Sequence, residues 1–262
     1  MGTYSRQFML TFFQQLAYRN EALYIFGMGN LASALLYILF AALLKTKILG
    51  VNAWIKPLKF ALSIGIFSLT MAWFTYELHL PATINLYNWA VIVLLGFENC
   101  YIGVQAARGQ LSHFNQSSPF YAFMFVLMGL AAALTTLYTG YIGLLFITTD
   151  FPHLPAYYLL AIRLGILLFV VFSFQGGAMG ARLRHTIGGE DGGPGLPLLN
   201  WSTKYGDLRI AHFIGMHALQ VLPLLSFYVF KNTVITAIAG LLYGLLAMYT
   251  LVRALKGKPL FA

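Results

Sequence analysis

The fold is decided by long apolar stretches, of which Phe120–Leu145, FYAFMFVLMGLAAALTTLYTGYIGLL, is an example. This stretch contains no charged residue, and its apolar residues are continuous instead of alternating with polar ones. About 20 apolar residues are needed to cross roughly 30 Å of hydrocarbon as a helix. Because every backbone polar group must be satisfied inside the membrane, the stretch predicts a spanning α-helix and not a barrel strand.

Seven runs in the chain meet this length criterion. They are Leu23–Leu44, Leu58–Glu77, Leu86–Ala107, Phe120–Leu145, Ala156–Met179, Ile210–Phe230 and Thr233–Leu255. The composition agrees, because 60% of the 262 residues are hydrophobic and 9% are charged, too few to cover a water-soluble surface. We therefore predict an all-α integral membrane protein, a bundle of seven transmembrane helices.

The basic residues predict the orientation of this bundle, because lysines and arginines near helix ends stay on the cytoplasmic side. One set of loops carries three of them and the opposite set carries twelve, with Arg163 inside the fifth run left out. The three are Arg6, Arg19 and Lys231; the twelve are Lys45, Lys47, Lys56, Lys59, Arg108, Arg182, Arg184, Lys204, Arg209, Arg253, Lys256 and Lys258. We expect the N-terminus outside and the C-terminus inside, as in a bacterial-type inner membrane.

This placement also accounts for the net charge of +9. Basic residues beside a leaflet of anionic lipids are ordinary in membrane proteins, so the expected partners are membrane lipids and not nucleic acid. The sequence leaves the oligomeric state open.

The N-terminal segment, residues 1–20, differs from the seven runs. Its apolar part is short, and Phe12 and Leu16 share one helix face while Gln14 and Gln15 lie on another. We expect a short amphipathic helix at the membrane interface, followed by a single transmembrane domain over residues 21–262. The single cysteine, Cys100, excludes an internal disulfide, and we expect it to be a buried thiol.

Helix starts and the one sizeable loop can also be predicted. Ser118 before Pro119 is typical of a capped helix start, and Asp207 is placed to cap the sixth span. The loop 185–206 is glycine-rich but lacks the Lys and Ser/Thr spacing of a phosphate-binding P-loop. We expect a mobile connection whose apolar second half, 196–201, folds back onto the cytoplasmic mouth of the bundle.

Two familiar uses of a helical membrane bundle are not supported. A retinal protein needs a lysine in the middle of its last helix, and Thr233–Leu255 contains none. A membrane hydrolase with zinc on a His-x-x-x-His motif is also excluded, since His212 and His217 are five residues apart. Their side chains point about 140° apart on a helix, so they do not chelate one metal together.

Ionisable groups inside the spans are costly and are normally paired or functional. Glu98, Arg163 and His217 stand in three different runs, and we expect Glu98 to pair with Arg163, helped by His217 and Gln220. One interpretation is a buried ion pair that fixes helix packing. The other is a functional centre, because three titratable groups exceed what one packing contact requires.

A polar stripe follows from Glu98 toward the predicted cytoplasmic side. Glu98, Gln105 and Ser112 recur every seven residues, with Arg108 beside them. Polar and charged residues of other loops are expected on the same side. We predict a cationic, His-lined pocket with catalytic residues His212, His113 and Glu98, and with ligand-binding residues Arg108, Gln105, Ser112, Asn115, Lys59, His185, Trp201, Asp207 and Arg209.

Such a pocket suits an anionic amphiphile or cofactor, such as a lipid headgroup, a quinone-like ring or haem held by its propionates and a histidine. We therefore predict a protein that binds, and in one version processes, such a ligand; whether it is an enzyme, and whether it holds haem or another metal, stays open. One alternative is a small proton-linked transporter that uses Glu98 and His217. Another is a non-catalytic receptor or assembly module whose polar network is structural.

Overall fold

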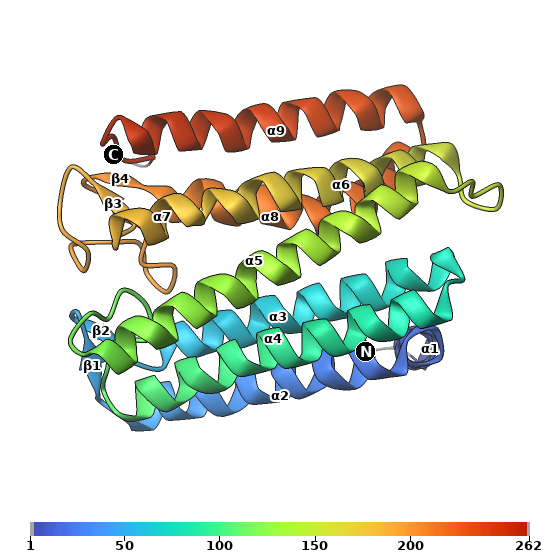
Figure 1. Cartoon of the computed structure of the whole chain (residues 1–262). Helices are drawn as coiled ribbons and strands as arrows, with labels where there is room; N and C mark the ends of the chain where they lie inside the picture. Colours follow the sequence, from blue (N-terminus) through green and yellow to red (C-terminus); the bar gives the residue numbers. More distant parts are fainter. Residues whose placement is uncertain (1–2, 261–262) are drawn as a thin grey trace. The chain divides into compact units, whose positions relative to one another are not determined.

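The structure is a computed structural model that describes residues 3–260, with side chains described from Thr11 onward. Within these residues, seven helical segments are long and apolar enough to cross a membrane, as predicted (Figure 1). They are Glu21–Leu43, Ile55–Leu78, Pro81–Ala107, Pro119–Thr148, Ala156–Arg182, Leu208–Phe230 and Thr233–Leu255. The protein is therefore an integral membrane protein whose helices contact lipid.

The elements follow one another along the chain in an almost entirely helical order. They are α1 (Thr3–Arg19), α2 (Glu21–Leu43), β1 (Lys47–Ile48), β2 (Val51–Asn52), α3 (Ile55–Thr75), η1 (Tyr76–Leu78), α4 (Pro81–Ala107), α5 (Pro119–Thr148), α6 (Ala156–Gln175), α7 (Gly177–Arg182), β3 (Thr186–Ile187), β4 (Gly206–Asp207), α8 (Leu208–Leu225), the π-helical turn η2 (Ser226–Phe230) and α9 (Thr233–Leu255). The strands form two short two-stranded sheets, β1–β2 and β3–β4.

The predicted helix starts are confirmed where a side chain fixes them. Ser118 Oγ accepts from the backbone N–H of Tyr121, and Pro119 occupies the first turn of α5. Asp207 caps α8 in the same way, through the N–H of Arg209. The largest boundary error is at α4, which begins at Pro81, five residues before the apolar run, because a first-turn proline starts a helix regardless of hydropathy.

The chain forms two compact units, and each is described by itself. The first comprises Met1–Thr46 and Asn52–Gln110, and the second comprises Lys47–Val51 and Leu111–Ala262. In the first unit, α2, α3 and α4 run side by side (Figure 1). Glycines allow close contact there, since a Cβ on Gly27 would lie 3.2 Å from the carbonyl oxygen of Gly65.

Buried amides join the three long helices of the first unit. Asn20, just before α2, exchanges two hydrogen bonds of 2.9 Å with Asn88 of α4, and its amide also donates to Thr75 Oγ1 of α3. Nearby, Arg19 forms a salt bridge with Glu77 and lies 3.9 Å above the ring of Trp73. These contacts fix the end of α1 against α3; the predicted position of α1 at the membrane interface remains a prediction.

The second unit is built around α6 and α8. A close backbone contact between them is at Gly165 of α6, where a Cβ would lie 3.0 Å from the carbonyl oxygen of Ala218 in α8. Further along, Phe172, Ala211 and Ala247 form a buried cluster that joins α6, α8 and α9. The antiparallel pair β3–β4 lies beside the end of α9 (Figure 1).

One expectation about burial is wrong. Cys100 is exposed on α4 instead of buried. In a membrane protein an apolar residue is equally stable against lipid or against a neighbouring helix, so its apolar character does not predict the face on which it lies.

Candidate ligand site around the start of α8

Asp207 is the centre of a polar network that begins α8. Its side chain is fully buried, with 0% exposed. Its two carboxylate oxygens accept from the backbone N–H groups of Ser202 and Arg209 and from the guanidinium of Arg209, whose Nη2 lies 2.6 Å from Oδ2. Strand β4 places the residue, because Asp207 pairs with Thr186 of β3.

The charge of Asp207 is stabilised inside the protein. Burial by itself favours the neutral carboxyl, but the hydrogen bond and charge of Arg209 outweigh it and hold the pKa of Asp207 below its ordinary value. The N–H of Ser202 and the nearby imidazole of His185 act in the same direction. Asp207 and Arg209 therefore neutralise each other, so within this network they position the chain and do not present free charge.

A second carboxylate closes the glycine-rich loop. Asp191 accepts from the backbone N–H groups of His185 and Thr186, and the Nδ1 atom of His185 lies 3.2 Å from Asp191 Oδ1. The same Nδ1 atom lies 3.9 Å from Asp207 Oδ1. The loop is thus held by two carboxylates and the β3–β4 pair, and its mobility remains a prediction.

His212 occupies a gap at the end of α6. Its Nδ1 atom lies 2.7 Å from the carbonyl oxygen of Phe172, in the last turn of α6, where helix carbonyls lose their intrahelical partners. A Cβ at Gly176 would lie 2.8 Å from His212 Cε1, so glycine makes room for the ring. Because a carbonyl only accepts, Nδ1 carries the proton and Nε2 of neutral His212 keeps its lone pair.

Aromatic contacts connect His217 with the loop. The ring of His217 lies 4.3 Å from that of Phe213, which lies 5.4 Å from Trp201 (centroid distances). The Nδ1 atom of His217 lies 3.3 Å from Gln220 Oε1. A row of aromatic contacts therefore joins the loop before α8 to residues within that helix, through Trp201, Phe213 and His217.

The turn before α5 holds three more predicted site residues. The Nδ1 atom of His113 lies 3.3 Å from Ser112 Oγ, and the imidazole packs against the ring of Phe125. Asn115 is buried; its amide donates to the carbonyl oxygen of Leu111, and its Oδ1 accepts from Ser117. The side chain of Asn115 thus stabilises this turn through hydrogen bonds to residues of the same turn.

Four further predicted residues, Glu98, Gln105, Arg108 and Lys59, lie in the first unit. Glu98 and Gln105 are both buried on α4, whereas Arg108 at its end is exposed and Lys59 is partly buried. The predicted seven-residue stripe is wrong at Ser112, because α4 ends at Ala107. Arg163, in the second unit, donates from Nε to the carbonyl oxygen of Phe146 at 2.7 Å. The pairing of Glu98 with Arg163 and the convergence of Glu98 with His113 and His212 remain predictions.

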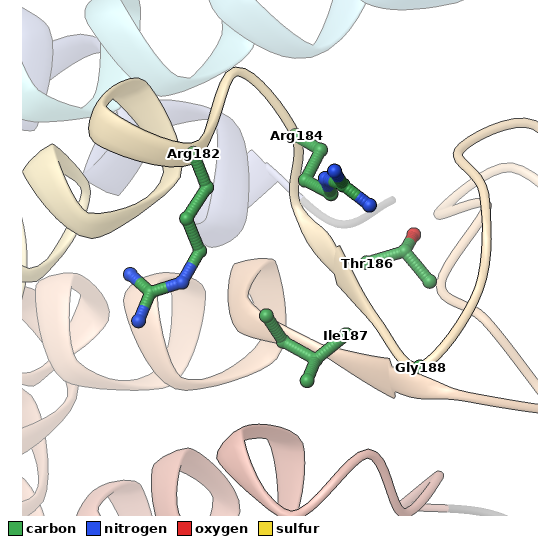
Figure 2. A pocket seen from close by; sticks show the side chains of 5 residues that line it. All are labelled: Arg182, Arg184, Thr186, Ile187 and Gly188. Atoms are coloured by element: carbon green, nitrogen blue, oxygen red, sulfur yellow. The ribbon is translucent and has the colours of Figure 1, made fainter.

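A pocket lies in the second unit next to this network. It has a volume of about 350 Å³ and is lined by Arg182, Arg184, Thr186, Ile187 and Gly188. Figure 2 shows Arg184 and Thr186 extending to one side of the segment that enters β3, and Arg182 and Ile187 to the other. In the sequence, the two arginines served only to predict the orientation. Their position on either side of the apolar Leu183 was the one sequence feature that could have indicated this pocket.

The donor set of this region does not suit a metal held by three protein ligands. Within residues 3–260, no three His, Cys, Asp or Glu side chains form such a group. Comparison with protein-family models, with curated proteins and with solved structures finds no match to this chain.

Proposed function

We propose that the protein binds the anionic headgroup of a membrane amphiphile, such as a lipid phosphate, in the pocket lined by Arg182 and Arg184. The observation that carries this proposal is a pocket of about 350 Å³ with two arginines among its five lining residues. Arginine binds phosphate and carboxylate through paired N–H donors, so it is the side chain best suited to such a headgroup.

The charges of these two arginines are not neutralised within the described part of the chain. The Nη1 atom of Arg182 donates to the carbonyl oxygen of Ala178, and no carboxylate forms a salt bridge with Arg182 or Arg184 there. Arg209, in contrast, is paired with Asp207. The positive potential of the pocket is thus available to a ligand, which would supply the missing counter-charge.

Apolar side chains next to the arginines support an amphiphile over a free anion. Leu183 stands between Arg182 and Arg184, is 45% exposed and has a left-handed backbone with φ of 51°. Ile187 lines the pocket itself. A lipid offers both parts at once, with a phosphate for the guanidinium groups and acyl chains for the apolar side chains.

The size of the cavity limits the ligand. Small-molecule sites usually measure about 300–1,000 Å³, and this pocket is at the lower end of that range. It accommodates a headgroup more readily than a whole haem or quinone. Binding does not require the catalytic roles predicted for His212, His113 and Glu98, which remain a proposal for a second, chemical step at the Nε2 lone pair of His212.

We also propose that the pocket belongs to the cytoplasmic side of a bacterial-type inner membrane. The twelve-to-three distribution of basic residues supports this orientation. It would expose the pocket to the leaflet that carries most anionic lipid.

Lipid binding to variants of the purified protein tests the proposal. The variants are Arg184→Ala, Arg182→Ala and their combination, with Lys45→Ala as a control that removes one exposed cation elsewhere. The probes are a phosphatidic acid, the corresponding neutral diacylglycerol and inorganic phosphate. Loss of one charge-assisted contact costs about 1.5–3 kcal/mol, so we expect each single variant to weaken phosphatidic acid binding by roughly tenfold or more.

Two results would overturn the proposal. One is equal affinity of the wild-type protein for phosphatidic acid and diacylglycerol. The other is an Arg182→Ala/Arg184→Ala variant that binds phosphatidic acid as well as Lys45→Ala does. Preference for inorganic phosphate over the lipid would identify a free-anion site instead.

A further inference from the structure

A directed chain of amides crosses from α4 to α2 in the first unit. Asn99 Nδ2 donates to Asn30 Oδ1 at 2.7 Å, and Asn30 Nδ2 donates to the carbonyl oxygen of Phe26 at 2.8 Å. The Phe26 carbonyl only accepts, so it fixes the orientation of Asn30, and Asn30 then fixes that of Asn99. As a result Asn99 presents its oxygen, Oδ1, at the open end of the chain.

That oxygen is buried and has no partner. Asn99 is 8% exposed, and its Oδ1 accepts no hydrogen bond within the described residues. The contact between α2 and α4 continues at Gly103, where a Cβ would lie 2.7 Å from the hydroxyl of Tyr37. Close packing on this side keeps Asn99 Oδ1 in place, and burial of an unmatched acceptor is unfavourable.

Glu98, the next residue on α4, presents a second unmatched acceptor. Its side chain is 5% exposed, and Oε1 accepts no hydrogen bond in the part of the chain that the structure describes. Glu98 is the one Asp, Glu, Lys or Arg residue within α4, and α2 contributes none after Glu21. The cations of α3 are Lys56 and Lys59 in its first turn, and the charge of Lys56 acts on Glu98.

We propose that Glu98 Oε1 binds a small cation, either a proton or Na⁺, inside the membrane-spanning part of the first unit, with Asn99 Oδ1 as a second buried acceptor on the next residue of α4. Both atoms are acceptors without a hydrogen bond, and the amide nitrogens of Asn30 and Asn99 donate along the chain to Phe26 instead of to them. A cation or a proton in direct contact is what these two oxygens lack. Carboxylate and amide oxygens are also ligands preferred by hard cations.

A purely structural role explains the observations less well. An acidic residue in the middle of a span costs at least about 2.5 kcal/mol, and a packing role would recover that cost through hydrogen bonds or a salt bridge. Within residues 3–260, Oε1 of Glu98 accepts no hydrogen bond and Glu98 takes part in none of the salt bridges described above. Asn30 and Asn99 already join α2 to α4 without it.

The wild-type protein in detergent provides the first test. Dicyclohexylcarbodiimide, an apolar reagent, modifies protonated carboxyls inside membranes, and peptide mass spectrometry locates the adduct. We expect an adduct at Glu98 that decreases as the pH is raised. Protection by NaCl, but not by choline chloride, would identify Na⁺ as the cation, and no protection by either salt would identify the proton.

Binding of radioactive sodium and infrared spectroscopy of the carboxyl band provide the second test. We expect Glu98→Gln to lose one bound sodium or the carboxyl band that Glu98 contributes to the pH-dependent spectrum of the wild-type protein. Glu21→Gln, the same change at an exposed carboxyl at the start of α2, should lose neither. The site is refuted if wild-type Glu98 forms no adduct and the wild-type and Glu98→Gln proteins show the same sodium binding and the same carboxyl bands.

Discussion

The ion pair at the start of α8 predicts unequal effects for its two members. Asp207 is completely buried, whereas the side chain of Arg209 is 24% exposed. Replacing Arg209 with methionine removes the counter-charge of a carboxylate that does not reach water. Breaking a buried pair in this way costs about 3–5 kcal/mol.

Replacing Asp207 with alanine has a smaller expected cost. The remaining guanidinium is partly exposed and can be hydrated, so the loss is mainly the helix cap, about 1 kcal/mol, and a screened charged hydrogen bond, about 1–2 kcal/mol. We therefore expect Asp207→Ala to lower the free energy of unfolding by about 2–3 kcal/mol in all. The double variant should lose less than the sum of the two, because the residues share one interaction.

The measurement is the free energy of unfolding in mixed detergent and dodecyl sulfate micelles, for the wild type, both single variants and the double variant. Lys204→Met is the control, since it removes an exposed cation from the same loop that forms no salt bridge in the described chain. Strictly additive losses, or a larger loss for Asp207→Ala than for Arg209→Met, would refute the reasoning.

Further predictions concern pH, packing and orientation. Because the pKa of Asp207 is lowered in the folded protein, its stabilising effect is present above about pH 4 and is lost as the pH falls through the lowered value. The free energy of unfolding should therefore fall less steeply with acid in Asp207→Asn than in the wild type. Gly165→Ala should lower the free energy of unfolding by about 1–3 kcal/mol, because its Cβ meets the backbone of α8. Gly129→Ala, with nothing within 4 Å of its Cβ, should be neutral or stabilising. Thermal unfolding in detergent compares the two variants, and equal melting temperatures would contradict the packing argument. A green fluorescent protein fused after Ala262 should fluoresce, and alkaline phosphatase there should be inactive; the reverse pattern would invert the orientation.

The spans could be predicted from sequence because one physical requirement, the thickness of the hydrocarbon, decides them. The run Thr233–Leu255 coincides with α9, and Asp207 is confirmed as a helix cap. The facing of residues could not be predicted in the same way, as Cys100 shows. Lipid and protein interior are similarly apolar, so the sequence of a spanning helix differs little between its lipid-facing and its buried residues.

Much of the candidate site depends on contacts that sequence does not encode locally. The partner of His212 is the backbone carbonyl of Phe172, and any residue would provide such a carbonyl. The Gly176–Gly177 pair, where α6 gives way to α7, was the only local indication of a helix end there. Likewise, both Asp191 and Asp207 lie near the imidazole of His185 in the loop 185–206, which their sequence separation does not reveal.

The paired amides of Asn20 and Asn88 have a consequence for synthesis of the protein. Asn88 lies in α4 and Thr75 ends α3, so α3 and α4 must both emerge from the ribosome before the group around Asn20 is complete. Until then the amides of Asn20, Asn30, Asn88 and Asn99 need water or another donor at the insertion machinery. The first three spans should therefore leave that machinery together, after α4 has been translated, instead of passing into lipid one at a time.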